Sequence, residues 1–157
     1  MDKKINQRRQ SQTQTKAANS SLQAKAKNAT ITFGKHLTLD AYGCDCQALD
    51  NMEMIYKFLD ELPGKIAMRP ITPPFVIRFA GNDKKDPGGI SAFIMIAESH
   101  ISIHTFPAKK YLTMDLYSCN MFDHNKVIKI VKDVFGYQKL EKHIIKRGLR
   151  FPKDNLV

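Results

Sequence analysis

Apolar residues recur along this chain with two different periods, one typical of strands and one typical of helices. Alternating or continuous apolar runs predict strands. In chain order they occupy residues 31–42, a proline-interrupted segment over 65–79, and then 90–97, 100–106, 111–117 and 140–146. A polar, glycine-rich stretch over 81–89 is predicted to be a turn before the third of these strands.

Apolar residues spaced three or four apart predict two helices between the strands. The first is predicted to be capped by Asp45 or Asp50 and to end at Pro63–Gly64. The second is predicted to follow a cap at Asp123 and to stop at Gly136. This arrangement predicts an α+β fold, a two-layer sandwich in which two helices cover one face of an antiparallel sheet.

Positive charge is concentrated near the N-terminus. The net charge is +10, and residues 1–30 alone carry seven basic side chains against one acidic one. Because this segment has almost no large apolar residue, we expect a disordered basic tail over 1–30, one folded domain over 31–150 and a C-terminal tail over 151–157. No recognition motif accompanies the charge, so nucleic-acid binding is not expected as the main function.

Side chains that can take part in catalysis are most concentrated in residues 98–107, with the sequence ESHISIHTFP. An acid, a serine and two histidines directly follow a predicted buried strand, where polar groups are costly unless each finds a partner. On an uninterrupted strand His100 and His104 share one face and Ser99 lies on the other. Ser99 and His104 can therefore meet only if the strand bends or is broken near residues 98–100.

Metal binding and disulfide formation are not predicted. His100, His104 and Cys119 are of ligand type, but a strand spreads a His-x3-His pair apart, so no metal site is expected. Cys44 and Cys46 form no CxxC pair, and three cysteines make no disulfide framework. Reduced thiols, no signal peptide and no membrane-length apolar run lead us to expect a cytoplasmic protein with no membrane partner.

The 98–107 motif resembles the processing site of the prokaryotic S-adenosylmethionine decarboxylase proenzyme family, which is pyruvoyl-dependent and self-processing. Residues 34–37, 40–45 and 115–119 resemble further segments of the same family. The resemblance spans approximately residues 31–148 and leaves only the tails outside. Its most specific part is the ten-residue motif together with a cysteine 20 positions beyond the motif's serine.

The resemblance implies that the chain cuts itself between Glu98 and Ser99. The Ser99 hydroxyl would attack the Glu98 carbonyl and convert the amide into an ester. A β-elimination would then separate a β chain, residues 1–98, from an α chain, residues 99–157. Residue 99 would lose ammonia and become a pyruvoyl cofactor at the head of the α chain.

The resemblance also implies roles for three other side chains. His104 would assist processing, and Ser91 would have an auxiliary role. The pyruvoyl ketone would form a Schiff base with the substrate amine and accept electrons as carbon dioxide leaves. Cys119 would then donate a proton to the carbanion, which suits a thiol because an ordinary thiol is mostly protonated at neutral pH.

The implied substrate is a small molecule, S-adenosylmethionine, decarboxylated for spermidine synthesis by an obligate dimer with active sites at the interface. One position departs from the family: a glutamate associated with the ribose hydroxyls is replaced by Ala108, followed by Lys109 and Lys110. A methyl group cannot accept hydrogen bonds from a diol. A pyruvoyl-dependent arginine or ornithine decarboxylase is therefore an alternative, and a processing-dead regulatory homologue is another.

Overall fold

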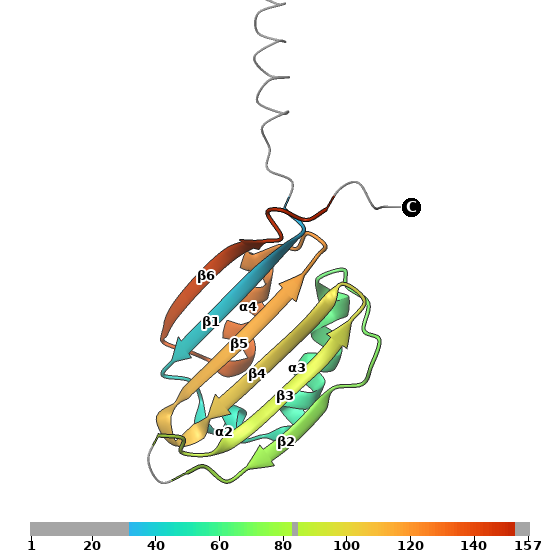
Figure 1. The fold of residues 1–157 in the computed structure, drawn as a ribbon. Coiled ribbons are helices and arrows are strands. Elements are labelled where there is room, and N and C mark those ends of the chain that lie inside the picture. Colours follow the sequence, from blue (N-terminus) through green and yellow to red (C-terminus); the bar gives the residue numbers. More distant parts are fainter. Residues whose placement is uncertain (1–31, 83–84, 153–157) are drawn as a thin grey trace, which may run out of the picture. The chain divides into compact units, whose positions relative to one another are not determined.

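The computed structural model describes residues 32–82 and 85–152, and its main element is an antiparallel sheet (Figure 1). The strands run in the order β2-β3-β4-β5-β1-β6, and every neighbouring pair is antiparallel. Their bounds are β1 Gly34–Tyr42, β2 Phe75–Phe79, β3 Gly89–Ile96, β4 Ser99–Phe106, β5 Tyr111–Ser118 and β6 Lys139–Arg147.

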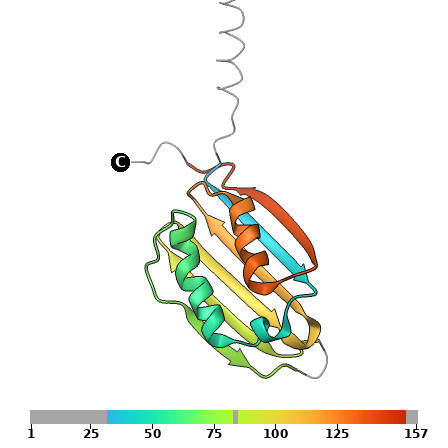
Figure 2. The ribbon, with the colours of Figure 1, turned by 180° about the vertical axis from the view of Figure 1, so that it is seen from behind.

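The helices lie together on one face of this sheet, as seen from behind in Figure 2. They are α2 Cys46–Leu49, α3 Met52–Lys65 and α4 His124–Phe135, and a 3-10 turn, η1 Pro107–Lys109, joins β4 to β5. The predicted two-layer α+β sandwich is therefore confirmed, with two long helices and one short one. Among the described residues no helix covers the other face of the sheet, which is called the open face below.

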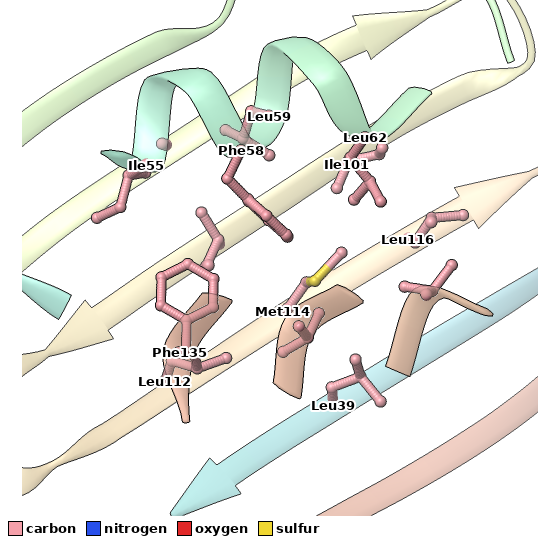
Figure 3. Packing of buried hydrophobic residues seen from close by; sticks show 14 of the residues in the cluster. Leu39, Ile55, Phe58, Leu59, Leu62, Ile101, Leu112, Met114, Leu116 and Phe135 are labelled. Atoms are coloured by element: carbon pink, nitrogen blue, oxygen red, sulfur yellow. The ribbon is translucent and has the colours of Figure 1, made fainter. Parts of the chain in front are cut away.

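The alternation of β4 shows how the sequence separates the two faces. Ile101, Ile103 and Thr105 are buried beneath the helices, whereas Ser102 and His104 lie on the open face. Each fully buried aliphatic side chain contributes about 1.5–3 kcal/mol. Figure 3 shows the resulting core, in which side chains of the sheet meet those of α3 and α4; among its members are Phe58, Leu59, Leu62, Leu112, Met114, Leu116 and Phe135.

The first predicted helix is wrong in its detail, because two helices occupy that segment. Asp45 caps α2 and accepts hydrogen bonds from the backbone N–H groups of the next turn, as predicted. Asn51, not Asp50, caps α3, and its side chain accepts from the Met54 N–H at 3.0 Å. Asp50 instead pairs with Arg78 of β2. The chain thus carries two consecutive acceptor side chains, and the second one starts the longer helix.

The predicted end of that helix and the following strand also need correction. Pro63 lies inside α3, which continues to Lys65. Of the proline-interrupted segment, only Phe75–Phe79 joins the sheet as a strand, and Pro70 makes one isolated bridge to Ile96. Proline has no N–H to give to a ladder, so residues 66–74 form a connection instead.

The boundaries of the second long helix agree with those predicted from the sequence. Asp123 caps α4, and Gly136 ends it in a left-handed conformation with φ 64°. The predicted tail over residues 1–30 lies outside the described residues, as do residues 153–157. Within the described part of the chain, no helix is long and apolar enough to cross a membrane.

Candidate active site

The Glu98–Ser99 bond lies at the hairpin between β3 and β4. Ile96 pairs with Ser99, so Ala97 and Glu98 alone make the turn. Such two-residue turns usually take positive φ at a central residue. Here the positive φ falls on Ser99, at 154°, and not on either turn residue. This region is strongly disfavoured for a residue other than glycine and costs about 1–3 kcal/mol, so backbone strain is present at the predicted cleavage site.

The Glu98 carbonyl faces a hydrogen-bond donor from a distant part of the chain. Ser99 pairs with Ser118 at the end of β5, which brings the next residue, Cys119, beside the hairpin. The Cys119 N–H donates to the Glu98 carbonyl oxygen at 3.0 Å. A backbone N–H aimed at a carbonyl stabilises negative charge that develops on its oxygen. The sequence motif did not reveal this contact, because it depends on the register of β4 and β5.

The Ser99 hydroxyl lies next to a histidine to which sequence reasoning gave no role. Its Oγ is 3.3 Å from Nδ1 of His100. Both side chains are half-buried. The His100 ring also lies beside the Tyr117 ring, with 5.9 Å between centroids. The sequence shows only that Ser99 and His100 are neighbours. Whether their side chains approach each other depends on the unusual backbone conformation of Ser99.

Ser91 and His104 form a second polar pair on the open face. They are directly opposite each other on β3 and β4, and Ser91 Oγ is 2.8 Å from His104 Nδ1. The histidine is exposed and the serine half-buried. The structure thus joins the two side chains to which the resemblance gives processing and auxiliary roles.

The structure does not bring this pair to Ser99 within one chain. His104 is five residues along β4 from Ser99, which corresponds to about 16 Å at the usual rise of a strand. Ser99 also has the parity of buried Ile101, whereas His104 lies on the open face. The motif therefore places its two main groups at opposite ends of one strand.

A cavity of about 370 Å³ lies at the Ser91–His104 end of the sheet, and we call it the loop cavity. Its wall consists of Asn82, Lys85, Asp86, Pro87, Phe106, Lys109 and Tyr111. The rings of Phe106 and Tyr111 stack with 5.5 Å between centroids. Burial, and a hydrogen bond to the Asp40 carboxylate, raise the pKa of Tyr111, so its hydroxyl stays protonated. The cavity combines aromatic, amide and charged groups.

The three cysteines lie in different environments and are all free thiols. Cys44 is buried, and this burial raises its pKa to about 11. Cys46 and Cys119 are exposed. Cys119 is therefore open to a small molecule at the hairpin, whereas Cys44 belongs to the core.

Apolar side chains gather on the open face along the β2 and β3 edge. Phe75 pairs with Phe93, and their rings lie 5.5 Å apart. Ile77 pairs with Ser91 in the next row of the same face. Together with Met95, these apolar side chains are all exposed. Contiguous apolar surface of this kind is typical of an interaction site.

Comparison with known proteins gives a consistent result. A sequence model of the S-adenosylmethionine decarboxylase family matches residues 35–148. An S-adenosylmethionine decarboxylase proenzyme of Clostridium botulinum (strain Langeland) is 33% identical over 116 residues, covering 73% of this chain and 94% of the relative. The corresponding proenzyme of Geobacillus sp. (strain WCH70) is 32% identical over 119 residues, covering 76% of this chain and 90% of the relative.

A solved structure gives the same result for the fold. The crystal structure of the adenosylmethionine decarboxylase from Aquifex aeolicus VF5 is similar to this chain with a TM-score of 0.63 and 27% sequence identity. The similarity covers 74% of this chain and 92% of the other. The matched family segment includes the hairpin, the Ser91–His104 pair and the loop cavity.

Proposed function

The chain belongs to the S-adenosylmethionine decarboxylase family, and we propose that the Glu98–Ser99 hairpin is where this proenzyme cuts itself. The protein is a decarboxylase made as a proenzyme, and it decarboxylates S-adenosylmethionine for polyamine synthesis. Its relatives give no support to arginine or ornithine as substrates, or to a processing-dead homologue.

The contact that carries the proposal is the hydrogen bond from the Cys119 N–H to the Glu98 carbonyl oxygen. When Ser99 Oγ adds to the carbonyl carbon, negative charge develops on this oxygen, where the donor is already in place. Breaking the amide C–N bond frees Ser99 from the backbone that forces its φ to 154°. Preorganised stabilisation and released strain therefore both favour conversion of this amide into an ester.

Elimination from that ester releases the chain up to Glu98 as a new carboxylate and leaves dehydroalanine at residue 99. This residue tautomerises to an imine, and its hydrolysis by one water molecule releases ammonia and gives the pyruvoyl group. The group supplies a carbonyl that binds the substrate amine and accepts electrons when carbon dioxide leaves. The exposed Cys119 lies beside the hairpin and is the group we assign to protonating the product carbanion.

A dimer completes the site in this proposal. Ser99 and Cys119 lie at one end of β4, whereas His104 and the loop cavity lie at the other, about 16 Å away. Two chains that stack their open faces about a two-fold axis perpendicular to the strands would place the first end of each against the second end of its partner. Burying the exposed apolar surface around Phe93 would favour association through this face.

The loop cavity is the part of the site that we assign to the nucleoside of the substrate. The stacked rings of Phe106 and Tyr111 offer an apolar surface for a base. Ala108 has no polar side-chain atom, so another group must accept the ribose hydrogen bonds. Asp86 lines this cavity and carries a carboxylate, and we assign this role to it.

Release of carbon dioxide by the processed protein tests the substrate assignment. S-adenosylmethionine, arginine and ornithine, each labelled in the carboxyl group, are supplied separately, and Ser99→Ala serves as the inactive control. We expect release from S-adenosylmethionine alone. Release from arginine or ornithine, with none from S-adenosylmethionine, would contradict the assignment. In the same assay Asp86→Ala is expected to raise KM for S-adenosylmethionine more than it lowers kcat.

A further inference from the structure

The structure assigns a catalytic role to His100, which we propose takes the proton from Ser99 Oγ in the first step of self-cleavage. This inference rests on the proposed cleavage at Glu98–Ser99. His100 Nδ1 is 3.3 Å from Ser99 Oγ, close to the reach that proton transfer requires. An alcohol is a weak nucleophile until a neighbouring base accepts its proton. His100 is thus in contact with the reacting atom itself.

The other histidine of the motif cannot do this within the same chain. His104 lies about 16 Å along β4 from Ser99. In the proposed dimer the partner's His104 is instead available for the later elimination, which takes a proton from Cα and not from Oγ. The two histidines therefore act on different atoms at different steps.

Packing on both sides holds the His100 imidazole in place. Across the sheet His100 pairs with Met95 on β3 and Tyr117 on β5. The centroid of the Tyr117 ring is 5.9 Å from that of His100 and also 5.9 Å from that of His36, so the three rings form a row. The guanidinium of Arg147 lies 4.5 Å from the Tyr117 ring centroid. This row restricts the ring that faces Ser99.

His36 closes the row with a carboxylate partner. Its Nε2 is 2.9 Å from Oδ1 of Asp115. Nothing in this contact touches Ser99, so we expect His36 to position the row and not to exchange protons with the substrate serine. The assignment of the base is thus specific to His100.

The step balances without any further reactant. The Oγ proton moves to Nδ1 of His100 while Oγ bonds to the Glu98 carbonyl carbon. The carbonyl oxygen becomes an oxyanion that accepts the Cys119 N–H. When the C–N bond breaks, the nitrogen of residue 99 takes the proton from His100. The amide has then become an ester and the imidazole is neutral again.

The test follows the first-order conversion of freshly translated full-length proenzyme into its two chains. His100→Asn keeps a polar side chain beside Ser99 but cannot act as a base. His143→Asn on β6, three strands from β4, is the matched control. We expect His100→Asn to slow conversion roughly 100-fold or more, the usual range for losing a general base, and the control to leave it unchanged.

Hydroxylamine identifies the blocked step, because it cleaves an ester at this position but leaves an amide intact. The His100→Asn chain is expected to stay whole in hydroxylamine. Conversion within a few-fold of the wild type, or accumulation of a hydroxylamine-sensitive ester, would overturn the assignment. If the wild-type chain itself remained uncut, the proposed function would fail instead.

Chemical rescue covers the case in which His100→Asn does not fold. His100→Ala leaves space at Ser99 for added imidazole, which should raise the rate of conversion in proportion to its concentration. A folded His100→Ala chain that converts no faster in imidazole would contradict the role of a base.

Discussion

Ser99 combines three structural features that favour the proposed self-cleavage. Its φ of 154° is imposed by a turn that only Ala97 and Glu98 form. The carbonyl in front of it is held by the Cys119 N–H, and its hydroxyl lies against His100. Of these features the sequence predicted the residue and the bond but not the strain, because the conformation of a hairpin depends on the register of its strands.

Backbone strain at Ser99 predicts a difference between two variants that cannot cut themselves. Glycine adopts this φ freely, whereas alanine does not. We expect Ser99→Gly to be more stable than Ser99→Ala by about 1 kcal/mol, the lower end of the usual cost of such a conformation. Urea unfolding of the two intact chains measures the difference. Equal stability, or a more stable alanine variant, would show that Ser99 is not strained.

Cys119 is predicted to serve processing through its backbone and decarboxylation through its thiol. Cys119→Ala keeps the N–H that faces Glu98 and loses only the thiol. We therefore expect near-normal cleavage but a roughly 100-fold loss of kcat with S-adenosylmethionine. Gel analysis of cleavage and carbon dioxide release by the purified variant separate these effects. Equal losses in both would mean that the thiol is also needed for processing.

At the scale of elements, the hydrophobic pattern was sufficient for most of the sheet and for α4. Alternation along β4 predicted which residues face the helices, since one face of the sheet is buried. The hydrophobic pattern could not separate α2 from α3, because the stripe of apolar residues continues across both. The break lies at Asp50 and Asn51, two adjacent residues with acceptor side chains, and pattern alone cannot decide which of them begins the longer helix.

Capping by Asn51 predicts a measurable contribution to stability. Its side chain accepts from the Met54 N–H at 3.0 Å, so Asn51→Ala leaves this donor without its partner. We expect a loss of about 1 kcal/mol, seen as a lower melting temperature in circular dichroism. Asn125→Ala in the first turn of α4 removes no cap and is the matched control. An Asn51→Ala chain as stable as this control would contradict the assigned cap.

At the scale of the whole molecule, the separation of Ser99 from His104 is the main property that sequence could not reveal. The motif lists both residues within six positions, yet an extended strand places them about 16 Å apart. In the proposed dimer a second chain would bring the two groups together, and one sequence does not specify where a partner chain lies. The exposed apolar side chains of the open face would favour this proposed association, because it removes them from water.

The proposed composite sites predict complementation between two inactive chains. A Ser99→Ala chain still carries His104, and a His104→Ala chain still carries Ser99. When both are produced together, we expect the His104→Ala chain to be cut in mixed dimers and the Ser99→Ala chain to stay whole. Different affinity tags distinguish the two products on a denaturing gel. If the His104→Ala chain is cut no more in the mixture than alone, each site is complete within one chain.

The intact mass of the purified wild-type protein under denaturing conditions is the most direct test of self-cleavage between Glu98 and Ser99. We expect two fragments divided between Glu98 and Ser99, with the α chain lighter by one ammonia than a chain headed by serine. Ser99→Ala should give a single mass. A wild-type chain that remains whole near 17.9 kDa after prolonged incubation would show that the protein does not cut itself at this bond.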